Sequence, residues 1–333
     1  MMLKLTKQKL DKLRNNFGGQ KIAVIGDMML DCYFRGDVKR VSPEAPVPVV
    51  EVENEFFRFG GAANVALNIL KLGGVPIPIG VIGNDNDGRI FTSLLNEADM
   101  IFDGIIEDTS RPTTAKTRVI AGNQHVVRID KESKENISHE TEKKLLEYLS
   151  SNIHHLQGII LQDYNKGVLT KTFIKNIIEM ANKKNVLVTV DPKFNNFFEY
   201  KNVTVFKPNK KEAEDILGMK IKSNEHITKA GRTILERSNA LNVLLTLGAE
   251  GIAVFEKDKT EKRMETKARK VADVSGAGDT VISTLTMALS AGGDIIEASY
   301  LANYAAGIVC EEVGIVPIEI EKLFDAVEKA TNE

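Results

Sequence analysis

The 333-residue chain has no excess of positive charge, few cysteines and no long apolar run. Its 44 lysines and arginines against 46 aspartates and glutamates give a net charge of -2, which is no basic footprint for nucleic acid or an anionic membrane. No apolar stretch approaches the roughly 18 residues that span a membrane. The lysine-rich, amphipathic segment 1–16 lacks the apolar core of a signal peptide. Cys32 and Cys310 form no metal or redox pair motif. We expect a cytoplasmic protein with reduced thiols and with neither nucleic acid nor membrane as partner.

Several common binding motifs are also missing. Residues 83–90, GNDNDGRI, have nearly the spacing of a Walker A loop, but Arg89 and Ile90 replace the required Lys-Ser/Thr pair. The same segment fails as a calcium loop, because Leu94 stands where the last ligand is needed. No G-x-G-x-x-G follows a strand, no G-x-S-x-G elbow is present, and the pair His154 and His155 has no partner at metal-ligand spacing. These absences count against a nicotinamide-binding domain and against a histidine metal site.

Short β-branched runs alternate with amphipathic helical patterns along most of the chain. We expect strands at residues 21–26, 75–83, 158–163, 186–192, 203–209, 242–248 and 251–257. Helical patterns fall between them, for example at 62–74, 171–185 and 226–239, and three more run from Thr280 to the C-terminus. This alternation is the signature of βαβ units around a parallel sheet. The sequence therefore predicts one α/β domain over residues 1–333, with a mostly parallel central sheet flanked by helices.

Two segments break this rhythm. Residues 33–59 and about 110–130 are rich in proline, arginine and valine, alternate locally like strands, and have no helices between their strands. We expect them to form a small antiparallel β lid laid over one edge of the main sheet. Because an exposed sheet edge needs protection, a ligand or a second subunit is expected to cover this lid.

The segment VADVSGAGDT, residues 271–280, joins a glycine turn to a helix. Apolar side chains at Val281, Ile282 and Leu285 have the spacing of a buried helix face, which puts Asp279 in the first turn. One interpretation is structural, since glycine permits the turn and an acidic residue favours the helix dipole. The other is functional: a glycine-lined helix N-terminus binds phosphate, and a carboxylate beside it is placed to take a proton from an attacking hydroxyl.

Polar residues also stand where other predicted strands end. They occur in the segments VIGDMMLD, FGGAANVA, LQDYNKG, VDPK, KPNKKE and TLGAEG. Each has a structural explanation when taken alone; Asn209 and Glu212, for instance, form a possible capping box. In open parallel sheets, however, ligands bind at the carboxyl ends of the strands, where all these segments would meet. Acids, glycines and amides on one rim suit phosphate transfer from a nucleotide to a hydroxylated small molecule.

The segments GGAANVALNILKLGG and DVSGAGDT resemble the two signature regions of the ribokinase-like (PfkB) carbohydrate kinases, and the resemblance covers nearly the whole chain. The stretches RVSPEAPVPVVEV, QDYNKGVLT and VDPK are similar to those of the D-glycero-β-D-manno-heptose 7-phosphate kinases. The resemblance implies a ribokinase-like fold and ATP-dependent transfer of the γ-phosphate to the anomeric C1 hydroxyl of D-glycero-D-manno-heptose 7-phosphate. The product would be the 1,7-bisphosphate used in ADP-heptose and lipopolysaccharide core synthesis.

The same resemblance implies roles for individual residues. Asp279 would be the catalytic base, with backbone N–H groups for the transferring phosphoryl from Gly276, Ala277 and Gly278. Residues implied for the acceptor sugar are Asp31, Gly60, Gly61, Asn64, Asp163 and Lys166. Residues implied for ATP are Lys193, Asn209, Glu212, Thr246, Gly248, Gly251 and Asn303. Glu212 would also organise Mg²⁺ through water, and a monovalent cation such as K⁺ is a further candidate cofactor.

A phosphorylated acceptor would need cations in the lid, and arginine suits bidentate phosphate recognition. The arginines available there are Arg40, Arg58, Arg111, Arg118 and Arg128. The sequence leaves open which of the five acts, and we take Arg128 as the candidate contact. In this family lids often pair between subunits, so the resemblance also implies a homodimer formed through the lid.

The chain departs from the heptose-kinase pattern in two respects. Phe194, Asn195 and Asn196 follow VDPK where that subfamily usually continues with glycine, which leaves the identity of the sugar open. Such kinases are often fused to a C-terminal nucleotidylyltransferase, and we expect a stand-alone kinase with adenylyl transfer left to a separate protein. Two alternatives remain: the same fold acting on another sugar, sugar phosphate or nucleoside, or a non-catalytic sugar or nucleotide sensor. The intact GAG segment and Asp279 disfavour the sensor.

Overall fold

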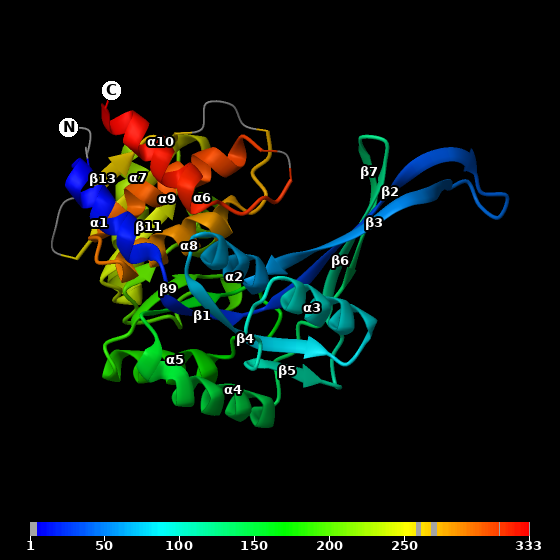
Figure 1. Cartoon of the computed structure of the whole chain (residues 1–333), viewed down its shortest axis with the longest axis horizontal. Helices are drawn as coiled ribbons and strands as arrows, with labels where there is room; N and C mark the ends of the chain where they lie inside the picture. The colour runs from blue at the N-terminus through cyan, green and yellow to red at the C-terminus, as the bar shows by residue number, and fades with distance from the viewer. Residues whose placement is uncertain (1–4, 258–260, 268–271, 313, 333) are drawn as a thin grey trace.

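The structure is a computed structural model that describes residues 5–257, 261–267, 272–312 and 314–332. Within these residues a nine-stranded main sheet forms the centre of the molecule (Figure 1). In spatial order its strands are β13 (Lys262–Met264), β12 (Ile252–Glu256), β11 (Asn242–Thr246), β10 (Val205–Phe206), β9 (Leu187–Asp191), β8 (Gly158–Gln162), β1 (Lys21–Gly26), β4 (Val75–Gly83) and β5 (Ile105–Asp108). Neighbouring strands are parallel from β5 to β11, and β12 and β13 are antiparallel. The predicted α/β class with a mostly parallel sheet is confirmed.

Helices cover both faces of this sheet. In β1 the side chains of Ile22 and Val24 pack into one hydrophobic cluster, and those of Ala23 and Ile25 into the other. The first cluster is covered by α1 (Lys7–Phe17), α2 (Ala62–Lys71), α8 (Ala277–Ser290), α9 (Ile295–Cys310) and α10 (Ile320–Asn332), and the second by α4 (His139–Asn152), α5 (Lys171–Lys183) and α7 (Asn224–Ser238). A parallel strand buried on both faces reads as a continuous apolar run, which is why these strands could be predicted.

Shorter elements complete the described chain. Helix α3 (Asn86–Glu97) buries Phe91 and Leu95 in the first cluster, and α6 (Lys210–Leu217) buries Ala213 in the second. Single 3-10 turns occur at η1 (Ile153–His155), η2 (Phe194–Asn196) and η3 (Gly248–Glu250). The strand predicted at 203–209 is reduced to the two residues of β10, because Pro208 has no N–H to continue the ladder. None of the described helices has the length and apolar character needed to cross a bilayer.

A second sheet, here called the lid sheet, contains β3 (Pro48–Gly61), β2 (Met28–Val41), β6 (Thr114–Ala121) and β7 (Gln124–Lys131), in that order. Its outer part projects away from the helical layers (Figure 1). The predicted lid segments are therefore strands. The first pair extends beyond 33–59 at both ends, whereas the second begins at Thr114, after the predicted residue 110, and ends at Lys131. The expectation of a purely antiparallel flap was wrong, because β2 and β6 pair in parallel. The reason is the path of the chain: it returns to the main sheet through α2, β4, α3 and β5 before β6, and so enters the lid in the same direction as β2.

Candidate active site

Helix α8 begins where the sequence predicts it, and Asp279 lies in its first turn. Gly276 caps the helix with φ +81°, and a Cβ there would lie 3.1 Å from Cγ2 of Ile315, so both backbone and space favour glycine. The amide of Ala277 donates to Val274 O at 3.3 Å. For the next two amides, of Gly278 and Asp279, the described residues supply no acceptor. These two N–H groups are therefore free to donate to an anion at the start of the helix.

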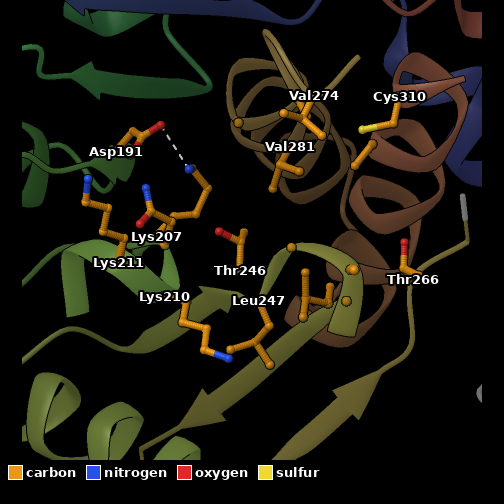
Figure 2. Close-up of a pocket in the computed structure, with 18 of the residues that line it drawn as sticks. Asp191, Lys207, Lys210, Lys211, Thr246, Leu247, Thr266, Val274, Val281 and Cys310 are labelled. Carbon is orange, nitrogen blue, oxygen red and sulfur yellow. Dashed lines mark ion pairs between the residues drawn. The ribbon is translucent and has the colours of Figure 1, made fainter. Parts of the chain in front are cut away.

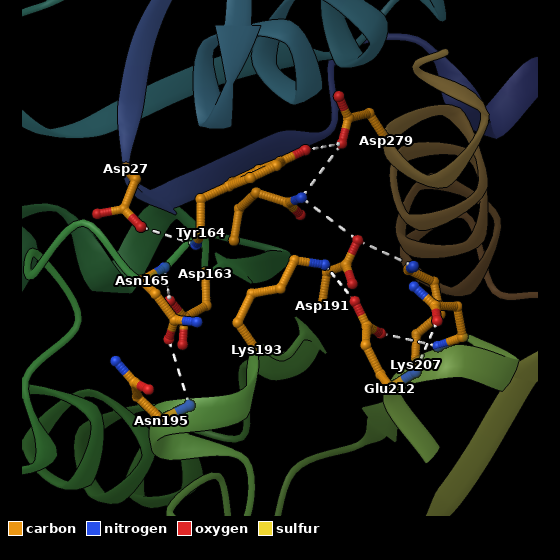
Figure 3. Close-up of polar contacts among 12 residues, drawn as sticks. Asp27, Asp163, Tyr164, Asn165, Asp191, Lys193, Asn195, Lys207, Glu212 and Asp279 are labelled. Carbon is orange, nitrogen blue, oxygen red and sulfur yellow. Dashed lines mark hydrogen bonds and ion pairs between the residues drawn. The ribbon is translucent and has the colours of Figure 1, made fainter. Parts of the chain in front are cut away.

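Three side chains from other parts of the chain hold the Asp279 carboxylate. Asn64 Nδ2, from the first turn of α2, donates to Oδ2 at 2.7 Å. The Tyr164 hydroxyl and Gln162 Nε2, at and just after the end of β8, donate to Oδ1 at 2.9 and 3.2 Å (Figure 3). Burial raises the pKa of Asp279 to about 6, against the lowering effect of Asn64 and Tyr164. The carboxylate is thus fixed in direction and more basic than an ordinary aspartate, as a general base requires.

The loop that carries Tyr164 is fastened by Asp27, the residue that follows β1. The Asp27 carboxylate accepts hydrogen bonds from the amides of Tyr164 at 2.7 Å, Lys166 at 3.1 Å and Val168 at 3.3 Å. Burial, with the charge of Asp163, raises the pKa of Asp27 to about 6 in spite of these donors. Asp27 therefore acts on the site through the backbone of the loop, and it explains why a carboxylate follows the first strand.

A buried ion pair lies beside the start of α8. Lys207 Nζ is 2.9 Å from Oδ2 of Asp191, and both side chains are less than 10% exposed (Figure 2). A Cβ on Gly278 would lie 3.8 Å from each of these two atoms. The pair therefore places a lysine cation next to the free amides of the helix, where a phosphoryl group in transfer needs positive charge.

A second lysine, Lys193, comes from the turn after β9. It pairs with Glu212, and its Nζ lies 5.5 Å from the centroid of the Tyr164 ring (Figure 3). Burial acts to lower the pKa of Lys193, but Asp191 and Glu212 outweigh it and raise that pKa above its usual value. Lys193 is thus a permanent cation between the tyrosine that holds the base and the start of α6.

The capping box predicted for Asn209 and Glu212 is present at the start of α6. Asn209 Oδ1 accepts from the Glu212 amide at 2.9 Å, and Glu212 Oε2 accepts from the Asn209 amide at 2.8 Å. The other oxygen of Glu212 meets Lys193. Burial raises the pKa of Glu212, and the charge of Asp191 adds to that effect. Glu212 therefore caps the helix and also joins the charge network of the site.

A pocket of about 900 Å³ opens between β11, the start of α6, the start of α8 and α9. Figure 2 shows lysines on one side of it and apolar side chains such as Val281 on the other. Among the residues predicted for ATP, those that line it are Lys193, Asn209, Thr246, Gly248, Gly251 and Asn303. Gly276, Ala277, Gly278 and Asp279 line it as well. A pocket with one charged wall, one apolar wall and the free amides of a helix start suits a nucleoside triphosphate.

The residues predicted for the sugar gather where the lid sheet reaches α2. A Cβ on Gly60 would lie 2.9 Å from Oδ2 of Asp31, so glycine makes room for this carboxylate. Gly61 has φ +56°, and a Cβ on it would meet the carbonyl oxygen of Asp27 at 2.4 Å. Asn64 follows in the first turn of α2 and reaches Asp279. The structure thus brings Asp31, Gly60, Gly61 and Asn64 to the lid side of the base.

Other predicted residues are engaged elsewhere. Asp163 is buried and accepts from the Tyr200 hydroxyl and the Asn165 amide, both at 2.7 Å. Arg128 is exposed on β7 and gives two hydrogen bonds to Asp130, at 2.8 and 3.0 Å. Four other candidate cations have these contacts: Lys166 with Glu132, Arg118 with Asp31, Arg111 with the carbonyls of Ser133 and Lys166, and Arg58 with the carbonyl of Ile315. Arg40 is exposed near the end of β2.

Sequence reasoning missed three residues of the site: Gln162, Tyr164 and Lys207. All three stand in the segments LQDYNKG and KPNKKE, close to residues that the sequence predicts for the site. A polar side chain at the last position of a buried strand was the signal available for Gln162. For Tyr164 and Lys207 the sequence carries no such signal, because a tyrosine or lysine after a strand more often faces water.

Comparison with known proteins decides the family. The chain matches the family described as pfkB family carbohydrate kinase over residues 19–321. The chain belongs to this family. It is therefore a phosphotransferase that acts on a sugar. It is 40% identical over 319 residues to "Bifunctional protein HldE" of Geobacter sulfurreducens, and 40% identical over 304 residues to the protein of that name from Helicobacter pylori strain J99. These matches cover 95% and 91% of this chain and 65% of each relative, so the chain spans about two thirds of the relatives it matches.

Solved structures show the same fold at low identity. The Arabidopsis thaliana ribokinase complexed with ribose and ATP has a TM-score of 0.73 and 18% identity, over 93% of this chain and 99% of that one. The Escherichia coli phosphofructokinase-2 in complex with fructose-6-phosphate has a TM-score of 0.74 and 16% identity, over 95% of this chain and 100% of that one. The fold is ribokinase-like, as the sequence resemblance predicted.

Proposed function

We propose that this chain is an ATP-dependent kinase that phosphorylates the anomeric C1 hydroxyl of D-glycero-D-manno-heptose 7-phosphate, giving the 1,7-bisphosphate. The observation that carries the reaction type is the oriented Asp279 carboxylate in the first turn of α8, beside two free amides and the Lys207–Asp191 pair. The choice of heptose rests on the stretches similar to heptose 7-phosphate kinases and on the relatives at 40% identity. A nucleotidylyltransferase would then use the product in ADP-heptose synthesis for the lipopolysaccharide core.

The residues divide the reaction between them. ATP lies in the 900 Å³ pocket with its phosphates toward Lys193 and Lys207. Asp279 takes the proton of the sugar hydroxyl while the sugar oxygen forms its bond to the γ-phosphorus. The bond between that phosphorus and the β–γ bridging oxygen breaks, and ADP leaves with the bonding pair. The amides of Gly278 and Asp279 hold the equatorial oxygens, so the phosphoryl group is neutralised while it transfers.

Magnesium fits this site as an ion held through water and phosphate. The described residues contain no cluster of three side chains that could cage a metal by themselves. Mg²⁺ usually keeps several waters and binds through one or two carboxylates plus the substrate phosphates. Oε1 of Glu212 accepts from Lys193 and Oε2 accepts from the Asn209 amide, so each oxygen keeps a lone pair for a water. Bound there, the metal would withdraw charge from the ATP phosphates.

The lid sheet gives a surface for the proposed homodimer. Its exposed apolar side chains are Val38, Val41, Val52, Val126, Val127 and Ile129, and Val47 is exposed in the turn between β2 and β3. A projecting sheet with apolar side chains in water is a site for pairing. We propose that a second copy covers it. Light scattering should give twice the chain mass, and replacing Val52 and Ile129 by lysine should give the monomer; a monomeric wild-type protein would refute this.

The function is tested by ATP consumption with Mg²⁺ and either K⁺ or Na⁺ against a panel of acceptors. The panel contains D-glycero-D-manno-heptose 7-phosphate, sedoheptulose 7-phosphate, fructose 6-phosphate, ribose, 2-keto-3-deoxygluconate and adenosine. We expect turnover with the heptose phosphate alone and a product that carries its new phosphate at C1. Turnover with another acceptor would overturn the heptose assignment and leave the Asp279 mechanism standing. Tight ATP binding without turnover on any acceptor would favour a sensor.

A further inference from the structure

Lys116, in the centre of the lid sheet, has none of the roles predicted from the sequence. Lys116 lies on β6, where its Cα pairs with Asp31 of β2 on one side and with Asp130 of β7 on the other. Because side chains alternate along a strand, Lys116 and Arg118 share one face of the lid sheet. Arg118 touches Asp31 on that face, at the sugar end of the site. Lys116 therefore stands among the charged groups that face an acceptor.

The carboxylates around Lys116 are each paired with another cation. Asp31 pairs with Arg118 at 2.6 Å, Asp130 with Arg128 at 2.8 Å, and Glu132 with Lys166 at 2.6 Å. Among the described residues no carboxylate is close enough to form an ion pair with Lys116. These three carboxylates each have a cation of their own. On this face Lys116, like Arg58 opposite Asp31, therefore has no carboxylate partner among the described residues.

Lys116 and the Asp279 carboxylate lie at the same tyrosine. Its Nζ lies 5.7 Å from the centroid of the Tyr164 ring, and the hydroxyl of the same tyrosine donates to Asp279. The tyrosine ring thus spans the distance between the catalytic carboxylate and the lysine. An acceptor with its attacking hydroxyl at Asp279 would extend along this ring toward Lys116.

The surroundings of Lys116 disfavour its charge. The side chain is half-buried, and this burial lowers the pKa of the ammonium; Lys166 adds to the lowering, and the nearby carboxylates, Asp31 first, oppose it without outweighing it. A dianionic phosphate would supply the missing counter-charge. Lysine is a common phosphate ligand in proteins, acting as a point charge. The arginine proposed from the sequence is less suited, since Arg128 is exposed and holds Asp130 with two hydrogen bonds.

We propose that Lys116 binds the phosphate monoester of the acceptor sugar and so selects phosphorylated acceptors. This inference rests on the proposed function in one respect: the acceptor is a sugar phosphate whose attacking hydroxyl meets Asp279. It does not depend on which sugar that is. Lys116 would then determine specificity from the lid, by binding the end of the acceptor that lies opposite the reacting oxygen.

The test compares Lys116→Met with Lys39→Met, a control that removes another lysine of the lid sheet. Lys39 is exposed and pairs with Glu51. For each protein kcat/KM is measured with the best sugar phosphate of the panel and with the same sugar lacking its phosphate, and KM is measured for ATP. Calorimetry with the sugar phosphate alone gives its affinity without turnover, and thermal melting shows that each variant is folded.

We expect Lys116→Met to lower kcat/KM for the sugar phosphate on the order of tenfold to a hundredfold, the usual effect of losing one charge-assisted contact. The values for the unphosphorylated sugar and for ATP should change little, Lys39→Met should match the wild type, and Lys116→Arg should restore much of the preference. Equal losses on both sugars, or no loss on the phosphorylated one, would overturn the inference. If the wild type prefers a sugar phosphate other than the heptose, the proposed function fails. The same comparison of variants still tests the inference, with that sugar phosphate as substrate. A wild type without preference for a phosphorylated acceptor refutes the inference.

Discussion

The hydroxyl of Tyr164 donates a hydrogen bond of 2.9 Å to Oδ1 of Asp279, across 115 residues of sequence. Burial and the adjacent Asp279 carboxylate raise the pKa of this tyrosine well above its usual value, so the phenol stays protonated and donates. Since Asp27 fixes the loop that carries it, Tyr164 is a positioning residue with a defined place. The Asp279 carboxylate, in the first turn of α8, is thus oriented by a side chain from the loop after β8.

Loss of the Tyr164 hydroxyl should move the pH profile. The reaction needs ionised Asp279, whose pKa of about 6 sets an acid limb on which kcat rises with pH. The tyrosine hydrogen bond stabilises the ionised form, so Tyr164→Phe should raise that pKa and shift the limb to higher pH by on the order of one unit. Tyr200→Phe is the matched control, because its hydroxyl binds the carboxylate of Asp163 instead. An unmoved limb in Tyr164→Phe would show that the contact does not tune the base.

Replacing Asp279 by asparagine should stop the chemistry and spare the nucleotide. We expect Asp279→Asn to lower kcat by on the order of a hundredfold or more, with nearly unchanged affinity for ATP. The affinity is measured by calorimetry and kcat by coupled assay. Turnover close to the wild type would remove Asp279 from the role of base.

The same variant makes a prediction about stability. The folded-state pKa of Asp279 is raised from 3.8 to about 6, so the wild type loses stability as pH rises through this window. Asparagine cannot ionise, so this pH-dependent loss is absent from Asp279→Asn. Melting temperatures measured from pH 4 to pH 7 should therefore fall less in the variant than in the wild type. Parallel curves would contradict the raised pKa.

Glu212 has two roles that one substitution can separate. Glutamine still caps a helix, so Glu212→Gln should keep the fold of α6 while removing the negative charge. We expect the Mg²⁺ concentration for half-maximal activity to rise several-fold, with little change in melting temperature. The control is Glu297→Gln, which makes the same change in the capping box of α9. An equal shift of the Mg²⁺ requirement in both variants, or none in either, would refute the proposed role for Glu212.

Two glycines at the start of α8 should fail in different ways. Gly276→Ala must adopt φ +81° and press on Ile315, so we expect it to lose stability by about 1 kcal/mol or more. At Gly278 a Cβ meets its nearest atoms at 3.8 Å, so alanine fits, but it points into the wall of the ATP pocket. Gly278→Ala should therefore keep its stability and lower kcat/KM for ATP. Denaturant titration and kinetics distinguish the two; the reverse pattern would contradict this reading of the helix start.

The buried pair of Lys207 and Asp191 should show strong coupling. Removing one partner leaves a buried charge, so Lys207→Met and Asp191→Asn should each cost about 3–5 kcal/mol of unfolding free energy. The double variant should lose less than the sum of the two, because no uncompensated charge remains. Urea titrations of all four proteins complete the cycle. Additive losses would show that the two side chains do not stabilise each other.

The sequence by itself determined the elements and several of their ends. The period of apolar side chains, which depends only on local geometry, indicated the parallel strands and the helix α8 with Asp279 in its first turn. The capping box of Asn209 and Glu212 could likewise be read from a spacing of three residues. The glycines at 60, 61 and 276 stand where a close approach or a positive φ requires them, so their presence was informative before the fold was known.

The tertiary structure alone decided which side chains meet. Tyr164 reaches Asp279, and Lys207 reaches Asp191, because the ends of β8, β9 and β10 meet the start of α8 at one rim of the sheet. The path of the chain between the lid strands decides the parallel pairing of β2 with β6. It also decides that Lys116 has no carboxylate partner among the described residues. Periodicity reports the environment of one element, whereas a contact across a hundred residues depends on how elements pack. For this reason the sequence could single out Asp279 as the candidate base, and only the fold identified the groups that orient its carboxylate.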